Sequence, residues 1–127
     1  MSTKTEGKHT AEFLVSEANG TRSRDEVTVT VPANTELEAG FVLGKLTATG
    51  KYVPYDNAGS DGSESAAGVL YEGYNNETGS PVDVVRTVVV RDAEVRDADL
   101  VWATGLVDAD KTAGKADLQD DHGIVAR

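Results

Sequence analysis

The chain of 127 residues contains no cysteine. This absence excludes disulfide bonds, thiolate metal sites and cysteine nucleophiles, and it fits assembly in a reducing cytoplasm. No apolar run approaches the roughly 18 residues that a membrane span needs, and the polar N-terminus lacks the apolar region of a secretory signal. Aromatic residues make up only 6% of the chain, so few bulky groups are available for a core. We expect a soluble, intracellular single domain with a modest core. Oligomerisation would add to the stability that this core provides.

Basic residues are also scarce. The chain has 12 Lys and Arg residues against 22 Asp and Glu residues, which gives a formal net charge of -10. Nucleic-acid phosphates would meet a repelling field on such a surface, because their binding depends on cationic side chains. The composition therefore predicts no nucleic-acid partner.

The first 26 residues are polar and nearly free of apolar side chains. We predict that residues 1–26 form a flexible N-terminal arm and that residues 27–127 form a β-rich domain. The apolar triplet Phe13-Leu14-Val15 is the exception within the arm. Two interpretations stay open for it: a patch that packs back onto the domain, or a docking point for a partner.

Most of the remaining chain has the pattern of short strands separated by turns. Residues 27–31 alternate Val and Thr and end at Pro32, which predicts a strand with one apolar face. Residues 41–46 predict a second strand, in which Gly44 indicates a bulge or a close backbone approach. A turn is expected at residues 75–79. Further strands are predicted at residues 52–55, 66–71, 82–90 and 124–126, with shorter pieces at Val95 and residues 100–102.

One helix is predicted, over residues 108–121. Asp108 or Asp110 would cap its start and Gly123 would end it, whereas Gly114 is unusual inside a helix. The residues thus predict a mainly β, small single-domain fold with one short C-terminal helix.

Motifs for cofactors and metals are incomplete. The oxygen-rich loop at residues 55–65 does not fit a calcium-binding loop, because Gly68 falls where the bidentate carboxylate must lie. The segment Gly40–Lys45 has one residue too few between its glycines for a phosphate loop. We therefore expect no cofactor, no metal site and no small-molecule substrate.

Catalytic residues are equally hard to assign. His9 and His122 are expected to be exposed bystanders, since the chain has no nucleophile elbow. A pair of carboxylates of the glycosidase kind stays open among the many acidic residues. Trp102 also has two interpretations, as a core anchor or as part of a subunit contact. The residues favour a protein that binds over one that catalyses.

The order of several segments resembles the bacteriophage lambda-type head decoration proteins, the family of the capsid-stabilising protein D. The resemblance runs in sequence order over most of the chain. It is carried by residues 12–24, 39–55, 61–70, 91–95, 100–102 and 122–127.

This resemblance implies a fold of the β-clip or β-barrel kind and a homotrimer without enzymatic activity or cofactor. It further implies a late protein made in the host cytoplasm that becomes cement on the outer surface of the virion. Such trimers sit at the three-fold and quasi-three-fold positions of the expanded shell. There they bridge copies of the major capsid protein and stabilise the head against DNA pressure.

For the docking mechanism we predict that the arm and the first strand add to the edge of a partner's sheet. Affinity would come from three arms acting together in the trimer. The predicted capsid-binding residues are Phe13, Leu14, Val15, Val27, Val29 and Val31, and Trp102 is the candidate trimer contact. Two alternatives from other classes are a carboxylate-dependent phage hydrolase domain and a generic, monomeric ligand-binding β-barrel.

Overall fold

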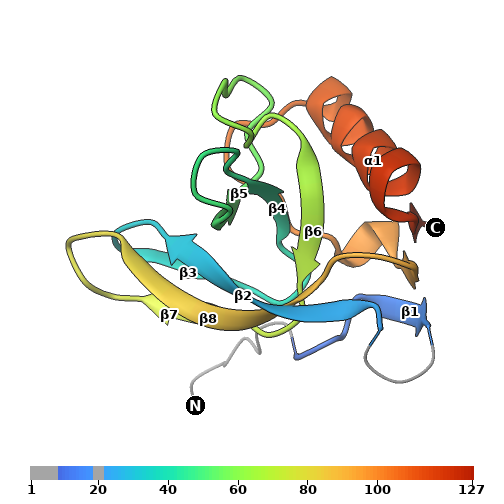
Figure 1. Cartoon of the computed structure of the whole chain (residues 1–127), viewed down its shortest axis with the longest axis horizontal. Coiled ribbons are helices and arrows are strands. Elements are labelled where there is room, and N and C mark those ends of the chain that lie inside the picture. Colours follow the sequence, from blue (N-terminus) through green and yellow to red (C-terminus); the bar gives the residue numbers. More distant parts are fainter. Residues whose placement is uncertain (1–8, 19–21) are drawn as a thin grey trace, which may run out of the picture.

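A five-stranded barrel forms the centre of the molecule in the computed structural model, which describes residues 9–18 and 22–127 (Figure 1). Its strands are neighbours in the order β2-β5-β4-β6-β8. They are β2 (Arg24–Val31), β4 (Val42–Lys45), β5 (Tyr52–Pro54), β6 (Ala66–Leu70) and β8 (Val82–Val89). The predicted mainly β, barrel-like fold class is confirmed, and each of these strands overlaps a predicted one.

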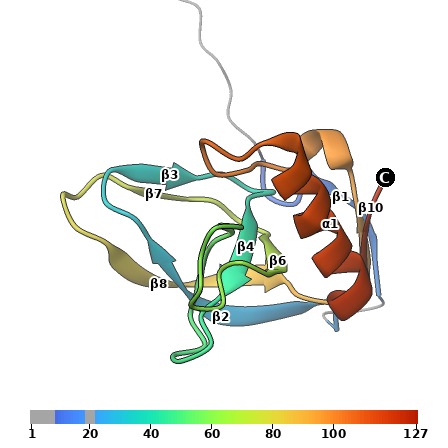
Figure 2. The same cartoon turned by 90° about the horizontal axis from the view of Figure 1, so that it is seen from above.

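Two small sheets flank the barrel. One has the order β1-β9-β10 and consists of β1 (Leu14–Glu17), β9 (Ala93–Val95) and β10 (Ile124–Ala126). The other pairs β3 (Thr35–Leu37) with β7 (Tyr74–Asn76) and lies beside the long β2–β8 ribbon (Figure 2). The sequence did not indicate β1, β3 or β7, because their residues (LVSE, TEL and YNN) form neither an apolar run of three nor an alternation of apolar and polar residues. Strand β7 begins just before the predicted turn and overlaps it.

The predicted C-terminal helix is confirmed as α1 (Asp108–His122) and is preceded by a short 3-10 helix, η1 (Asp97–Asp99). At its start, the carboxylate of Asp110 accepts the backbone N–H of Val107 at 3.3 Å, so Asp108 is not the capping residue. At its end, Gly123 takes the left-handed conformation with φ of 66°. No helix in the described part of the chain is long and apolar enough to cross a membrane.

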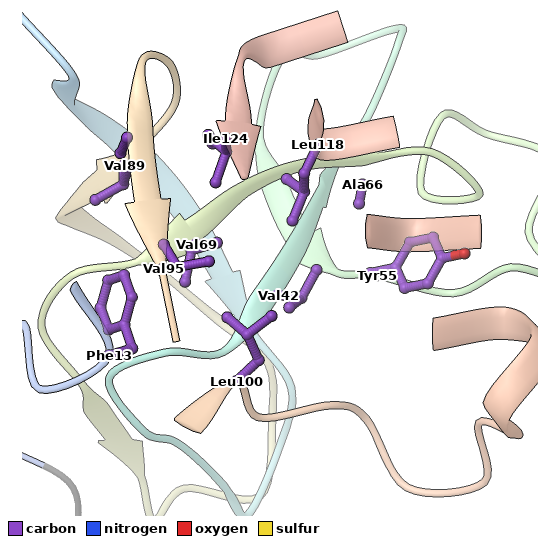
Figure 3. Packing of buried hydrophobic residues seen from close by; sticks show 11 residues of the cluster. Phe13, Val42, Tyr55, Ala66, Val69, Val89, Val95, Leu100, Leu118 and Ile124 are labelled. Carbon is purple, nitrogen blue, oxygen red and sulfur yellow. The ribbon is translucent and has the colours of Figure 1, made fainter. Parts of the chain in front are cut away.

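The core consists of two clusters of buried apolar side chains. One cluster fills the barrel with side chains such as Val29, Leu43 and Val88, none of them exposed. The other lies between the barrel, α1 and the β1-β9-β10 sheet, and it includes Phe13, Tyr55, Leu118 and Ile124 (Figure 3). Because the second cluster draws on both ends of the chain, the N- and C-terminal segments are tied into one domain.

Gly44 has the role that its place in a strand predicted. The pairing of β4 with β6 shifts register between Leu43 and Gly44. A Cβ atom at position 44 would lie only 2.8 Å from the backbone Cα and O atoms of Ser63. The strand therefore both bulges and meets another backbone closely there.

Candidate interaction surfaces

The apolar triplet is divided between the core and the surface. The Phe13 side chain is 1% exposed and packs in the cluster under α1, whereas Leu14 is half-buried and Val15 is 50% exposed. Of the two interpretations, packing back onto the domain describes Phe13. The prediction that Phe13 contacts the capsid stays a prediction, for which the enclosed ring leaves almost no exposed surface in this fold.

Strand β1 is held firmly against the domain by polar contacts. Its pairing with β9 is continued by the Arg96 N–H, which donates to the Phe13 carbonyl at 2.7 Å. Glu17 accepts hydrogen bonds from Ser23 and from the Arg24 guanidinium, with 2.8 Å between Nη2 and Oε1. Residues 9–18 and 22–26 of the predicted arm thus pack on the domain, and β2 crosses the predicted boundary at residue 26. Residues 1–8 and 19–21 of that arm lie outside the described residues.

The first predicted strand is not an available edge. All eight residues of β2 are paired with β8, and Val29 also pairs with Tyr52 of β5. Val29 and Val31 are 0% exposed and lie in the barrel core, while Val27 is half-buried. The capsid contact of Val29 and Val31 stays a prediction, for which barrel closure leaves no exposed surface, because it uses both edges of β2 and its apolar face.

Strand β1, by contrast, is an edge strand. The order β1-β9-β10 leaves one side of β1 without a neighbouring strand in the described part of the chain. Val15 on this strand is among the most exposed large apolar side chains of the described residues, with Val85 and Val107. The pairing of β1 with β9 shifts register at Val15. The unpaired outer backbone groups of β1, beside an exposed valine, are a template for strand addition.

Trp102 packs against the core, as one of its two predicted interpretations requires, while its role in a subunit contact stays a prediction. Its ring meets the Tyr55 ring edge-on at 6.0 Å, and both rings lie against Gly114, where a Cβ would be 3.0 Å from each. The Tyr55 hydroxyl donates to the Asp110 carbonyl at 2.9 Å, which fixes the pair against α1. The unusual helical glycine is therefore the point where α1 accommodates two aromatic rings. Trp102 itself is only half-buried.

The open side of Trp102 borders a groove of about 260 Å³, which we call the Trp102 groove. Four separate segments line it, so no local pattern could have predicted it. Its lining residues are Pro32, Thr35, Glu36, Leu37, Phe41, Pro54, Trp102, Ala103 and Thr104. The groove is apolar at its base, because Leu37 and Phe41 belong to the barrel core.

Three carboxyl groups have altered pKa values, and none of them has the shift that a hydrolase site needs. The Arg91 guanidinium donates to Asp25 at 2.7 Å and lowers the pKa of that carboxyl. The pKa of Asp83 is lowered by hydrogen bonds from Lys51 and Thr30, and that of Asp61 by hydrogen bonds from Ser63. A general-acid carboxyl needs the opposite shift. These three carboxylates are stabilised in their charged form, so none supports the hydrolase alternative.

A larger hollow of about 630 Å³ lies where β2, β4 and β5 meet the end of α1. Its lining mixes charges of both signs, including Asp25, Asp121, Lys45 and Arg91, and the Arg91 guanidinium already donates to Asp25 and to the Arg22 carbonyl. The interior of the barrel is filled by side chains. In the part of the chain that the structure describes, the barrel thus has no enclosed apolar pocket of the kind that the ligand-binding alternative requires.

Comparison with known proteins gives one family. The family model described as bacteriophage lambda head decoration protein D matches residues 3–124 of the chain, which is nearly its whole length. No curated protein gives a match with the chain.

Proposed function

Because the chain belongs to the bacteriophage lambda head decoration protein D family, whose role is to decorate phage heads, we propose that it acts as a capsid cement. In this proposal it binds as trimers to the outer surface of the expanded head, at three-fold and quasi-three-fold positions. Its partner there is the major capsid protein of the same phage, and its binding stabilises the shell against DNA pressure. The family is structural, and we propose no catalytic activity for this member.

The free edge of β1 is the observation that supports docking on the capsid. A capsid segment in extended conformation would add beside β1, with affinity from main-chain hydrogen bonds and specificity from side-chain contacts. Val15 would be covered by that added strand, and Leu14 would complete the apolar contact. In this proposal the strand that pairs with the capsid is β1, in place of β2. Val27, which is half-buried on the closed barrel, has no place in it.

Three weak contacts would act together in a trimer. Once one chain is bound, its two companions meet their sites at a high effective concentration, so the whole assembly binds far more tightly than one chain. The acidic balance of the chain supports an exterior location, because a protein of net charge -10 does not compete for the packaged DNA.

Co-sedimentation with phage heads that lack this component tests the proposal. We expect saturable binding to expanded heads and none to unexpanded heads. Val15→Asp should weaken binding by at least about ten-fold, because the added strand would cover a charge instead of an apolar side chain. Val85→Asp is the matched control, since Val85 is a comparably exposed valine (66%) on the barrel strand β8. Absence of binding to either kind of head would refute the cement role.

The length of any truncation matters for this test. Removal of residues 1–26 would also remove Phe13 from the core and the first residues of β2, so loss of binding would report loss of the fold. Removal of residues 1–8 leaves β1 and Phe13 in place. If that variant binds as the full chain does, docking depends on β1 and not on the preceding residues.

A further inference from the structure

The Trp102 groove has an acidic rim and an apolar base. At the base, Phe41 is 7% exposed and presents a small apolar surface, while Leu37 beneath it is 0% exposed. The Glu36 side chain is exposed on the strand β3 that borders the groove. In the described part of the chain, Glu36 has no ion-pair partner.

A complementary feature lies a few residues further along the chain. Val107, at the N-terminal boundary of α1, is 60% exposed. Lys111 follows one helical turn later, so it shares a side of the helix with Val107. Its ammonium group, like the Glu36 carboxylate, has no ion-pair partner among the residues that the structure describes. An exposed apolar side chain thus stands beside an unpaired cation.

The groove and this projection fit a contact between copies of the chain. Thr104, which lines the groove, is three residues from Val107, so their Cα atoms are at most about 11 Å apart. The groove and the Val107 projection are two different patches that lie close together. Each copy can therefore insert its projection into one neighbour and receive the projection of another around one axis. A contact of this heterologous kind closes into a ring when the rotation between copies is suitable.

We propose that Val107 of one copy inserts into the Trp102 groove of the next copy and that Lys111 of the first copy pairs with Glu36 of the second. This rests on the trimer of the proposed function and specifies the surface that joins its subunits. The apolar insertion supplies buried area, and the charge pair at the rim fixes the register. Trp102 then forms one wall of the interface while its other side stays packed on Tyr55.

Charge reversal tests the pairing in the full chain. Lys111→Glu and Glu36→Lys should each raise the protein concentration at half-association by roughly ten-fold, as measured by sedimentation velocity. The double variant K111E/E36K restores an opposite-charge pair, and we expect its association to return to that of the original chain. Circular dichroism and thermal unfolding of each variant establish that the fold is retained. Failure of the double variant to recover would overturn the assignment.

Cross-linking gives a second measurement that does not depend on weak association in solution. The chain has no cysteine, so single cysteines can be introduced without background reaction. Chains with Val107→Cys are mixed with chains carrying Thr35→Cys and treated with a short bismaleimide, both free and on expanded heads. We expect a heterodimer product from this mixture, and none from Val85→Cys mixed with Thr35→Cys. No product in either setting would contradict the proposal.

These experiments distinguish failure of the cement role from failure of the Trp102 interface. If the chain saturates expanded heads but Val107 and Thr35 do not cross-link there, the cement role stands and this interface is wrong. If the cross-link and the charge rescue both succeed but heads are not bound, the interface stands and the cement role is wrong.

Discussion

Gly44 and Gly79 show how differently two glycines can constrain one chain. The backbone of Ser63 approaches Gly44 so closely that a Cβ would lie 2.8 Å from two of its atoms, whereas nothing lies within 4 Å of a Cβ at Gly79. A backbone cannot move aside as a flexible side chain can. Gly44 is thus required by packing, while Gly79 serves an open turn.

We predict that Gly44→Ala lowers the free energy of unfolding by about 2 kcal/mol or more, because the bulge of β4 must shift away from residue 63. Gly79→Ala should change it by less than about 0.5 kcal/mol. Urea unfolding of both variants compares them directly. Equal stabilities would show that the loop at residue 63 adapts freely.

The Asp25–Arg91 pair gives a prediction about pH. Arg91 holds the pKa of Asp25 below its ordinary value, so the pair contributes stability above that ordinary value, near pH 4, and loses it as pH falls through the lowered pKa. Both side chains are more than two-fifths exposed, so solvent screening limits the contribution to less than about 1 kcal/mol. Arg91→Gln should therefore be less stable than the original chain at pH 7, and the stability difference should shrink as pH falls below about 4. A difference that does not shrink in acid would assign the effect of Arg91 to its other contacts, such as its hydrogen bond to the Arg22 carbonyl.

At the scale of elements, β1 decides what the N-terminal segment does. It pairs with β9, and β9 pairs in parallel with the terminal strand β10, so both ends of the described chain meet on one small sheet. Phe13 lies just before β1 and packs with residues of β9 and β10. The described part of the N-terminal segment is thus partly structural, and the outer edge of β1 is the side that it offers to a partner.

Replacement of Phe13 tests this division. We predict that Phe13→Ala lowers the free energy of unfolding by about 3 kcal/mol, the usual cost of emptying a buried phenylalanine site. Val15→Ala, two residues further, should cost less than about 0.5 kcal/mol because half of that side chain is already in water. Chemical unfolding measures both. If Phe13→Ala were neutral, β1 would be held by its backbone pairing alone.

At the scale of the whole molecule, association and stability are linked. A chain with few aromatic residues and a net charge of -10 has a modest core and repels its own copies at low salt. If copies join through the Trp102 groove, the folded state is stabilised by mass action. The melting temperature should then rise with protein concentration, and the rise should be larger at physiological salt than at low salt.

Calorimetry over a hundred-fold range of concentration measures this rise. Lys111→Glu should reduce the dependence while leaving the melting temperature of the dilute protein nearly unchanged. A melting temperature independent of concentration in the original chain would show that the folded copies do not associate over that range.

The sequence by itself determined the features that local patterns encode. Alternating Val and Thr in residues 27–31 predicted a strand, the spacing of turn residues predicted a mainly β chain, and Gly123 predicted the end of the C-terminal helix. Gly44 could also be interpreted correctly, because glycine in a strand has few other reasons to be there. The order of motifs was sufficient to indicate the family.

Only the tertiary structure decided which apolar side chains are left for partners. Phe13 and Val15 are two residues apart in the same triplet, yet one is enclosed by strands from the far end of the chain and the other faces solvent. The Trp102 groove is assembled from four distant segments. Burial is a property of long-range packing, and a sequence pattern extends only a few residues.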